Sequence, residues 1–174
     1  MDKQEKENLD QKLIEAAQNG DLVLVKSLLN QGADIHAQDD EALFWAGQKG
    51  NLEIVKYLVK KGADIHAEND YVLQIAAKNG HLAVVKYLVK KGADIQTDND
   101  CALKWAAAEG HLEVIKYFLF DCKMKVKQET KEHLKEKNQH KTLELIEKRD
   151  LLFKLDKDII QKDSIDNFSN KIKI

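Results

Sequence analysis

The side chains that could do chemistry in this chain are histidines and cysteines, both common metal ligands and catalytic groups. There are six histidines and two cysteines. Cys101 and Cys122 form no C-x-x-C pair. His36 and His66 occupy equal positions in two copies of a repeated segment, so they should lie about 8–10 Å apart. That is too far for one Zn²⁺ with bonds near 2 Å unless a third ligand lies between them. We therefore expect no metal and no cofactor.

The motifs of nucleotide binding and nucleophilic catalysis are also missing. The sequence has no G-x-G-x-x-G, P-loop or G-x-S-x-G. A Gly-Ala-Asp tripeptide recurs with its aspartate at Asp34, Asp64 and Asp94, and an active site is not normally present three times. We expect a structural role for these aspartates, and no enzyme.

The elements that position these residues come from one repeated segment. The thirty residues QDDEALFWAGQKGNLEIVKYLVKKGADIHA (38–67) return at 68–97 and, in part, at 98–120, and they are already present at 8–37. Self-similarity at a fixed period indicates a repeat architecture, in which each unit buries its apolar face only against its neighbours.

Each unit reads as two helices. Leu43, Ala46 and Gly47 share one helical face, and a second stripe follows at Leu52, Ile54, Val55, Leu58 and Val59. Gly50 and Gly62 end the two helices. Asp recurs at positions 10, 40, 70 and 100, where we expect it to cap the first helix of its unit. Trp45, Ile75 and Trp105 are equivalent and should stack in the core.

The segment A-A-x-x-G-H-L-x-x-V-K-x-L-x-x-x-G-A-D-I, nearly whole from Ala76 to Ile95, resembles the ankyrin repeat. The resemblance covers residues 8 to about 121 and implies an all-α solenoid of helix–turn–helix repeats. It also implies a structural role for His81 and His111, which begin second helices. The family's T-P-L-H start is missing, and the period is three residues shorter than usual. We therefore expect shortened hairpin connectors, reduced to turns. Short repeats of this kind are similar to those of giant-virus and intracellular-bacterial ankyrin proteins.

The predicted organisation is a single array with distinct ends. It comprises a flexible N-terminus (1–8), repeat 1 as N-terminal cap (9–37), repeat 2 (38–67), repeat 3 (68–97), repeat 4 (98–127), a C-terminal cap (128–155) and a loosely ordered tail (156–174). Two interpretations of the cap stay open. A shift of thirty-one residues aligns Leu134 with Leu103 and suggests a degenerate fifth repeat, whereas one long helix over 129–152 is the alternative.

Charge and hydropathy limit which cellular compartment and which class of partner we expect for this chain. The net charge of −2 gives no general attraction to nucleic acid or anionic membrane. Lysines recur along the second helices, and acidic residues gather in the connectors. There is no N-terminal apolar region and no long apolar run, so we expect neither a signal peptide nor a membrane span. We expect a cytoplasmic protein, or one in the host-cell cytoplasm if a parasite or virus exports it.

In the ankyrin family, partners bind the concave surface made by the connector tips and the exposed side of the first helices. Positions that vary between the repeats of this chain are free to specify a partner there. The candidates are Gln38, Asp39, Glu41, Phe44, Gln48, Lys49, Glu68, Asn69, Tyr71, Gln74, Lys78, Asn79, Asp98, Asn99, Lys104 and Glu109. Phe44 and Tyr71 are the aromatic members, and aromatic residues are over-represented in interface hot spots.

The resemblance thus implies a non-enzymatic protein–protein interaction module with an acidic concave face. We expect a monomer that binds a protein, with a host protein as the target if the source is a parasite or virus, and without binding nucleic acid or membrane. The alternative is a structural or assembly scaffold that has no dedicated ligand on its concave face.

Overall fold

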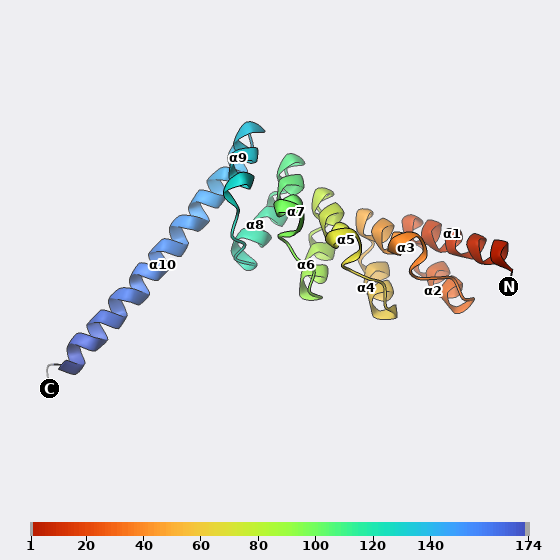
Figure 1. The fold of residues 1–174 in the computed structure, drawn as a ribbon, viewed down its shortest axis with the longest axis horizontal. Helices are drawn as coiled ribbons and strands as arrows, with labels where there is room; N and C mark the ends of the chain where they lie inside the picture. The colour runs from red at the N-terminus through yellow and green to blue at the C-terminus, as the bar shows by residue number, and fades with distance from the viewer. Residues whose placement is uncertain (1, 173–174) are drawn as a thin grey trace.

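The computed structural model describes the backbone of residues 2–172 and the side chains of residues 2–160. The described chain contains helices and no strand, which confirms the predicted all-α repeat fold. Paired helices lie side by side in one row, and the last helix leaves the row at its C-terminal end (Figure 1). The elements are α1 (Lys3–Asn19), α2 (Leu22–Asn30), α3 (Ala37–Gln48), α4 (Leu52–Lys61), α5 (Ala67–Lys78), α6 (Leu82–Lys90), α7 (Thr97–Ala108), α8 (Leu112–Lys116), the π-helical turn η1 (Tyr117–Asp121), α9 (Gln128–Glu136) and α10 (His140–Ile172).

Each hairpin forms as its apolar pattern predicts. In the second unit, α3 buries Leu43 and Ala46, and α4 buries Ile54 and Leu58. Gly50 follows α3 with a φ of 73°, a left-handed conformation that glycine adopts without a steric cost. The backbone N–H of the next residue, Asn51, donates to the carbonyl of Ala46 at 2.9 Å. This tight turn leaves α4 antiparallel to α3.

Stacking of the hairpins makes the core. First helices contact first helices (α1 with α3, α3 with α5, α5 with α7), and second helices likewise contact second helices. The buried apolar residues form one continuous cluster from Leu13 in α1 to Ile146 in α10. Full burial of a Leu or Val side chain contributes about 1.5–3 kcal/mol. A single hairpin could not bury these side chains, so each unit depends on its neighbours for stability.

Polar side chains at the starts of the second helices also tie adjacent hairpins together. His81 donates through Nε2 to the carbonyl of Gln48 in the preceding unit at 2.9 Å. Asn51, at the equivalent position one repeat earlier, donates to the carbonyl of Ala17 at 3.2 Å. His81 therefore bridges two adjacent repeats, which supports the structural role that the resemblance implied.

Both ends of the array differ from expectation. The flexible N-terminus predicted over 1–8 is wrong from Lys3 on, because α1 starts there. Asp2 accepts the N–H of Glu5 at 2.8 Å, and the Glu5 carboxylate accepts the N–H of Asp2 at 2.9 Å. This reciprocal capping box satisfies two otherwise unpaired backbone donors. Residue 1 lies outside the described part.

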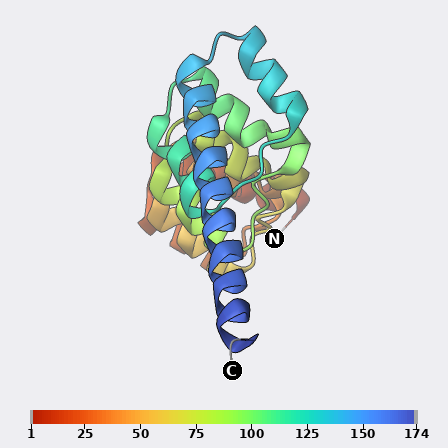
Figure 2. The ribbon, with the colours of Figure 1, turned by 90° about the vertical axis from the view of Figure 1, so that its left-hand side faces the viewer.

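The C-terminal part of the array contains two helices rather than one over 129–152. Asn138, with a φ of 55°, lies in the turn between α9 and α10. Leu134 of α9 and Ile146 of α10 are both buried, and α10 contacts α8, η1 and α9. Viewed along the row, α10 crosses the end of the stack and extends past it (Figure 2). The assignment of 128–155 as a fifth repeat stays a prediction.

The tail predicted to be loosely ordered over 156–174 is helical as far as Ile172, where the described backbone ends. No glycine or proline interrupts the sequence between 140 and 172, so nothing there stops the helix. Residues 173–174 lie outside the described part.

One packing contact between repeats 2 and 3 departs from the repeat pattern. Gly47 of α3 stands where the other repeats have alanine, and Val72 of α5 stands where repeats 2 and 4 have Ala42 and Ala102. A Cβ placed on Gly47 would lie 2.5 Å from Cγ2 of Val72. The extra bulk of Val72 therefore occupies the space that an alanine would need at position 47.

We predict that Gly47→Ala lowers the apparent free energy of unfolding by about 1–3 kcal/mol, because the β-branched Val72 cannot move aside. Gly47→Ala/Val72→Ala should recover most of this loss, since it recreates the Ala pair of repeats 3 and 4. Urea unfolding of the parent, both single variants and the double variant gives the coupling between the two sites. A Gly47→Ala variant as stable as the parent would contradict this packing account.

Candidate functional site

The connectors between hairpins end in left-handed backbone, directly before the regular part of the next first helix, instead of forming a β-hairpin. Gln38, Asp39 and Asp40 have φ values of 53°, 55° and 62°, and the same three-residue turn recurs at 68–70 and 98–100. A left-handed conformation costs about 1–2 kcal/mol per ordinary residue, whereas Asp and Asn tolerate it better. Seven of the nine residues in these turns are Asp or Asn. The predicted reduction of the connectors to turns is confirmed, and this composition makes it possible.

Buried aspartates hold these turns in place. Asp40 is 6% exposed. Its Oδ1 accepts the N–H of Asp64 at 3.0 Å, and its carboxylate also lies 3.2 Å from Nδ1 of His36. Asp40 thus bonds to the chain on both sides of its hairpin, and it does not cap its own helix. The predicted capping role is wrong, because the left-handed turn directs this carboxylate toward the following connector.

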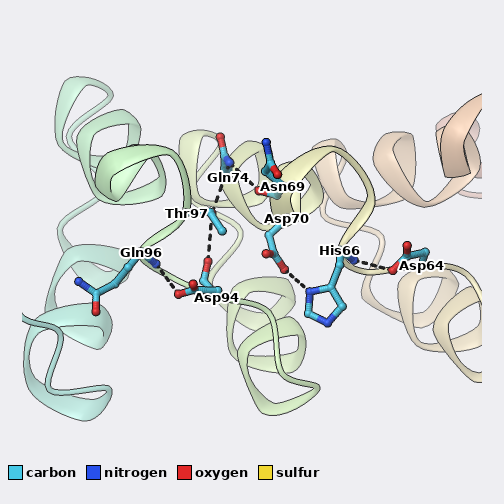
Figure 3. Close-up of polar contacts among 8 residues, drawn as sticks. All are labelled: Asp64, His66, Asn69, Asp70, Gln74, Asp94, Gln96 and Thr97. Atoms are coloured by element: carbon cyan, nitrogen blue, oxygen red, sulfur yellow. Dashed lines mark hydrogen bonds and ion pairs between the residues drawn. The ribbon is translucent and has the colours of Figure 1, made fainter.

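The other copies of this aspartate make related contacts. Asp10 accepts the N–H of Asp34 at 2.6 Å. Asp70 accepts a hydrogen bond from His66 Nδ1 at 2.9 Å (Figure 3). Asp100, which is fully buried, accepts the N–H of Lys127 at 3.1 Å and the hydroxyl of Thr130 at 2.8 Å. The recurring aspartate is therefore a polar bridge between a first helix and the connectors beside it.

The aspartates of the Gly-Ala-Asp tripeptides shape the same connectors. Asp64 Oδ1 accepts the N–H of His66 at 2.8 Å, and Asp94 Oδ1 accepts the N–H of Gln96 at 2.8 Å (Figure 3). Hydrogen bonds to the N–H two residues on are typical of Asx turns. These contacts support the predicted structural role, and they leave these oxygens engaged with the backbone.

A cavity of about 310 Å³ lies between the connectors of repeats 2 and 3. The lining residues come from the two left-handed turns and from the first turns of α3 and α5. They are Gln38, Asp39, Asp40, Glu41, Leu43, Phe44, Asp64, Ala67, Glu68, Tyr71 and Val72. Five of these side chains are carboxylates and two are aromatic rings, and none is lysine or arginine. The cavity therefore combines negative charge with an apolar surface.

The two rings belong to a row of aromatic side chains that crosses three repeats. Phe44 and Tyr71 stack with their planes 5° apart and their centroids 5.4 Å apart. Trp45 meets Phe44 edge to face, and Trp105 meets Tyr71 in the same way, at 5.3 and 5.9 Å. Offset and edge-to-face pairs are the arrangements that ring quadrupoles favour. The row therefore fixes the orientation of Phe44 and Tyr71.

The expectation that Trp45, Ile75 and Trp105 stack in the core holds only for Ile75. Ile75 is buried, whereas both tryptophans are half-buried beside Phe44 and Tyr71. Each tryptophan ring also interacts with a polar or charged side chain. Trp45 donates its indole N–H to Glu41 at 3.0 Å, and Nζ of Lys78 lies 5.2 Å from the centre of the Trp105 ring. Both interactions need groups that stay near solvent.

Six of the sixteen candidate residues line the cavity, and one of the others must be withdrawn. The six are Gln38, Asp39, Glu41, Phe44, Glu68 and Tyr71. Gln74 is only 2% exposed, and its amide donates to the carbonyl of Asn69 at 2.9 Å (Figure 3). The same amide also donates to Asp98 at 3.0 Å. Gln74 is therefore a buried link between connectors. Its position varies between repeats because its packing differs, not because it is open to a partner.

The remaining candidates lie outside the cavity. Lys49, Asn69, Asn79, Asp98 and Glu109 are exposed, and Gln48, Lys78, Asn99 and Lys104 are half-buried. Asn79 donates to the carbonyl of Ile75 at 2.8 Å, and Asn99 donates to the Glu129 side chain. Their membership of a binding surface stays a prediction.

Five lining residues were missed by sequence reasoning. They are Asp40, Leu43, Asp64, Ala67 and Val72. Most of them repeat from unit to unit, so a comparison that seeks varying positions assigns them to the scaffold. Val72 does carry a signal, because it replaces alanine directly beside Tyr71.

The cysteines are protonated, free thiols. Burial raises the pKa of the Cys101 thiol, and Asp98 raises it further against a smaller opposing effect of Lys104. Burial also raises the pKa of Cys122, which shares a hydrogen bond with Tyr117, and burial with this bond raises the pKa of Tyr117 to about 12. A thiol nucleophile needs a lowered pKa instead.

In the part of the chain whose side chains are described, no group of three or more His, Cys, Asp or Glu residues is arranged to hold a metal ion. Among the helices of that part, none has the length and apolar character needed to cross a membrane.

Comparison with known proteins identifies the repeat. A family model described as ankyrin repeats (3 copies) matches residues 3–69 and 62–130. No curated protein matches the chain.

We predict that Asp40→Ala lowers the free energy of unfolding by about 1–3 kcal/mol, because the partly buried N–H of Asp64 loses its acceptor. Asp39→Ala is the matched control, because Asp39 has the same left-handed backbone as the adjacent Asp40 but its side chain is exposed. This control should be less destabilising than Asp40→Ala, because it loses only the tolerance of aspartate for left-handed backbone and no hydrogen bond. Urea unfolding compares the two variants, and equal losses would show that the left-handed turn, not the hydrogen bond, sets the cost.

Proposed function

Because the chain belongs to the ankyrin-repeat family, whose members are generally protein–protein interaction modules, we propose that it binds a protein partner through its concave face. We define the concave face as the exposed side chains of the connectors together with the exposed side of α3, α5 and α7. The family is typically non-enzymatic, and we propose a binding role without catalysis here as well. A host protein is the proposed target if the source is a parasite or virus, with the cytoplasm as the proposed compartment.

The observation that carries this proposal is the stacked pair Phe44 and Tyr71 in the cavity between repeats 2 and 3. Both rings are half-buried, so each keeps accessible surface. They come from positions that vary between repeats, whereas the neighbouring lining residue Leu43 has leucine at its equivalent position in the other three repeats. Aromatic side chains in a well-packed depression are typical interface hot spots.

Rigidity of the surrounding connectors favours the same function. The bond from Asp64 N–H to Asp40 and the bond from His66 Nδ1 to Asp70 hold the two turns before any partner arrives. A preformed surface loses little conformational freedom on binding, so more of the contact energy appears as affinity.

The alternative function is a structural or assembly scaffold. The observation that favours it is a set of exposed apolar side chains on α10, namely Leu151, Leu152, Phe153, Leu155 and Ile159. Light scattering after size-exclusion chromatography separates the two functions. The proposed binding module is a monomer at micromolar concentration, whereas a self-association scaffold forms oligomers that Leu151→Lys/Leu155→Lys disperses.

We predict that Phe44→Ala/Tyr71→Glu abolishes capture of the partner, because it removes the stacked rings and adds a charge at their site. Phe44→Tyr/Tyr71→Phe is the matched control, since it keeps two stacked rings and should retain capture. The measurement is affinity capture from cell lysate with mass spectrometry, combined with circular dichroism to verify that both variants remain folded.

A protein retained by the parent and the ring-preserving control, and lost by the ring-removing variant, would support the proposal. Retention of the same proteins by all three would contradict it and move the binding surface away from the concave face.

A further inference from the structure

We infer that the cavity between repeats 2 and 3 accepts a cationic side chain, lysine or arginine, from a basic segment of the partner. This inference rests on the proposed binding function and adds the chemistry of the group that enters the site. Three observations support the inference: the cavity lining carries negative charge, two of its carboxylates have no hydrogen-bond partner in the described part of the chain, and two aromatic rings lie beside these carboxylates.

The lining carboxylates fall into two groups. Asp40, Glu41 and Asp64 already accept hydrogen bonds, from Asp64 N–H, Trp45 Nε1 and His66 N–H respectively. Asp39 and Glu68 are exposed, and across the described part of the chain neither side chain has a hydrogen bond or ion pair. These two free carboxylates belong to the successive left-handed turns, so they reach the cavity from both of its connectors.

The charge excludes an anion, and the arrangement of the carboxylates disfavours a bare metal ion. No positively charged side chain lines the cavity, so a phosphate or carboxylate ligand would meet only repulsion. A metal ion needs several oxygen ligands converging at about 2.0–2.6 Å. Among the residues with described side chains, no three acidic or histidine groups converge in that way. The separated carboxylates of the cavity suit a larger organic cation that carries several hydrogen-bond donors.

The aromatic pair supplies the second half of the recognition. The methylene stem of lysine or arginine can pack on the ring surface of Phe44 and Tyr71 while its charged end reaches Asp39 and Glu68. Lysine ammonium and arginine guanidinium groups are also attracted to aromatic faces within about 6 Å. The same chain already uses this interaction, since Lys78 lies over Trp105.

The equivalent junction between repeats 3 and 4 lacks both the aromatic pair and the purely acidic lining. There Gln74 replaces Phe44, Cys101 replaces Tyr71, and Lys104 adds a positive charge. Gln74 is buried and donates a hydrogen bond to Asp98, so this carboxylate of the connector already has a partner. The proposed cation site is therefore specific to the junction of repeats 2 and 3.

The test uses nuclear magnetic resonance on the full chain with short glycine-flanked peptides that carry one central arginine, lysine or citrulline. Citrulline has nearly the shape of arginine without its charge. Since one exposed side chain binds weakly, titration to about 10 mM is needed. Arginine, lysine or both should shift backbone amide signals in 38–44 and 67–72, and added salt should weaken the shifts. Citrulline should have little effect.

Asp39→Asn/Glu68→Gln should weaken this binding roughly fivefold or more. Glu53→Gln/Glu113→Gln is the matched control, because it removes the same number of charges from the second helices and should leave binding unchanged. The amide spectra also report whether each variant is folded. Three results would overturn the inference: no shifts with either cationic peptide, equal shifts with citrulline, or equal weakening by the control variant.

The outcome is separable from that of the proposed function. If Phe44→Ala/Tyr71→Glu loses the partner while neither cationic peptide binds, the concave face is the interface and only the cation inference fails. If the peptides bind the cavity but the partner is retained by that variant, the proposed function fails and the cavity has no part in partner recognition.

Discussion

The hydrogen bond from the Asp64 N–H to the buried carboxylate of Asp40 is the interaction on which the connector geometry depends. A turn of three left-handed residues is unfavourable by itself, so it persists only where the surrounding structure fixes it. Asp40 does so by joining a first helix to the connector that follows it, and Asp10 and Asp100 make comparable bridges. These bonds link each first helix to the short connector beside it. They also bring neighbouring connectors together around a cavity.

The two long sides of the array have opposite electrostatic character, and their aromatic residues are used differently. On the connector side, Phe44 and Tyr71 stack on each other beside carboxylates that have no cationic partner among the lining residues. On the second helices, lysines lie over tyrosine rings instead, as Lys26 does over Tyr57 at 5.5 Å and Lys86 over Tyr117 at 5.3 Å. Those rings are already covered by cations, which leaves little aromatic surface for stacking against nucleic-acid bases. The connector side is therefore the better candidate for recognition.

Most of the fold could be predicted from the sequence, because it follows from local patterns. These are the repeat period, the small residues on the buried face of each first helix and the glycines that end the helices. Two kinds of feature were beyond such reasoning. The left-handed turns redirect Asp40 from its own helix to Asp64, a contact across twenty-four residues that no local capping rule anticipates. Burial at varying positions depends on the neighbouring repeat, so Gln74 was taken for a surface residue, and Trp45 and Trp105 for core residues. The sequence predicted a concave binding face and not a cavity. Six of the lining residues were candidates because they vary between repeats, whereas Asp40, Leu43 and Asp64 recur between repeats and were therefore interpreted as structural.

The central claim is that partners meet this protein at the cavity between repeats 2 and 3. Hydrogen–deuterium exchange of the chain with and without its captured partner tests that claim most directly, because it locates the contact without any substitution. The account predicts slower amide exchange at 38–44 and 67–72 in the complex, with 52–61 and 82–90 unchanged. Protection confined to those second helices, or to 140–160 of α10, would contradict it.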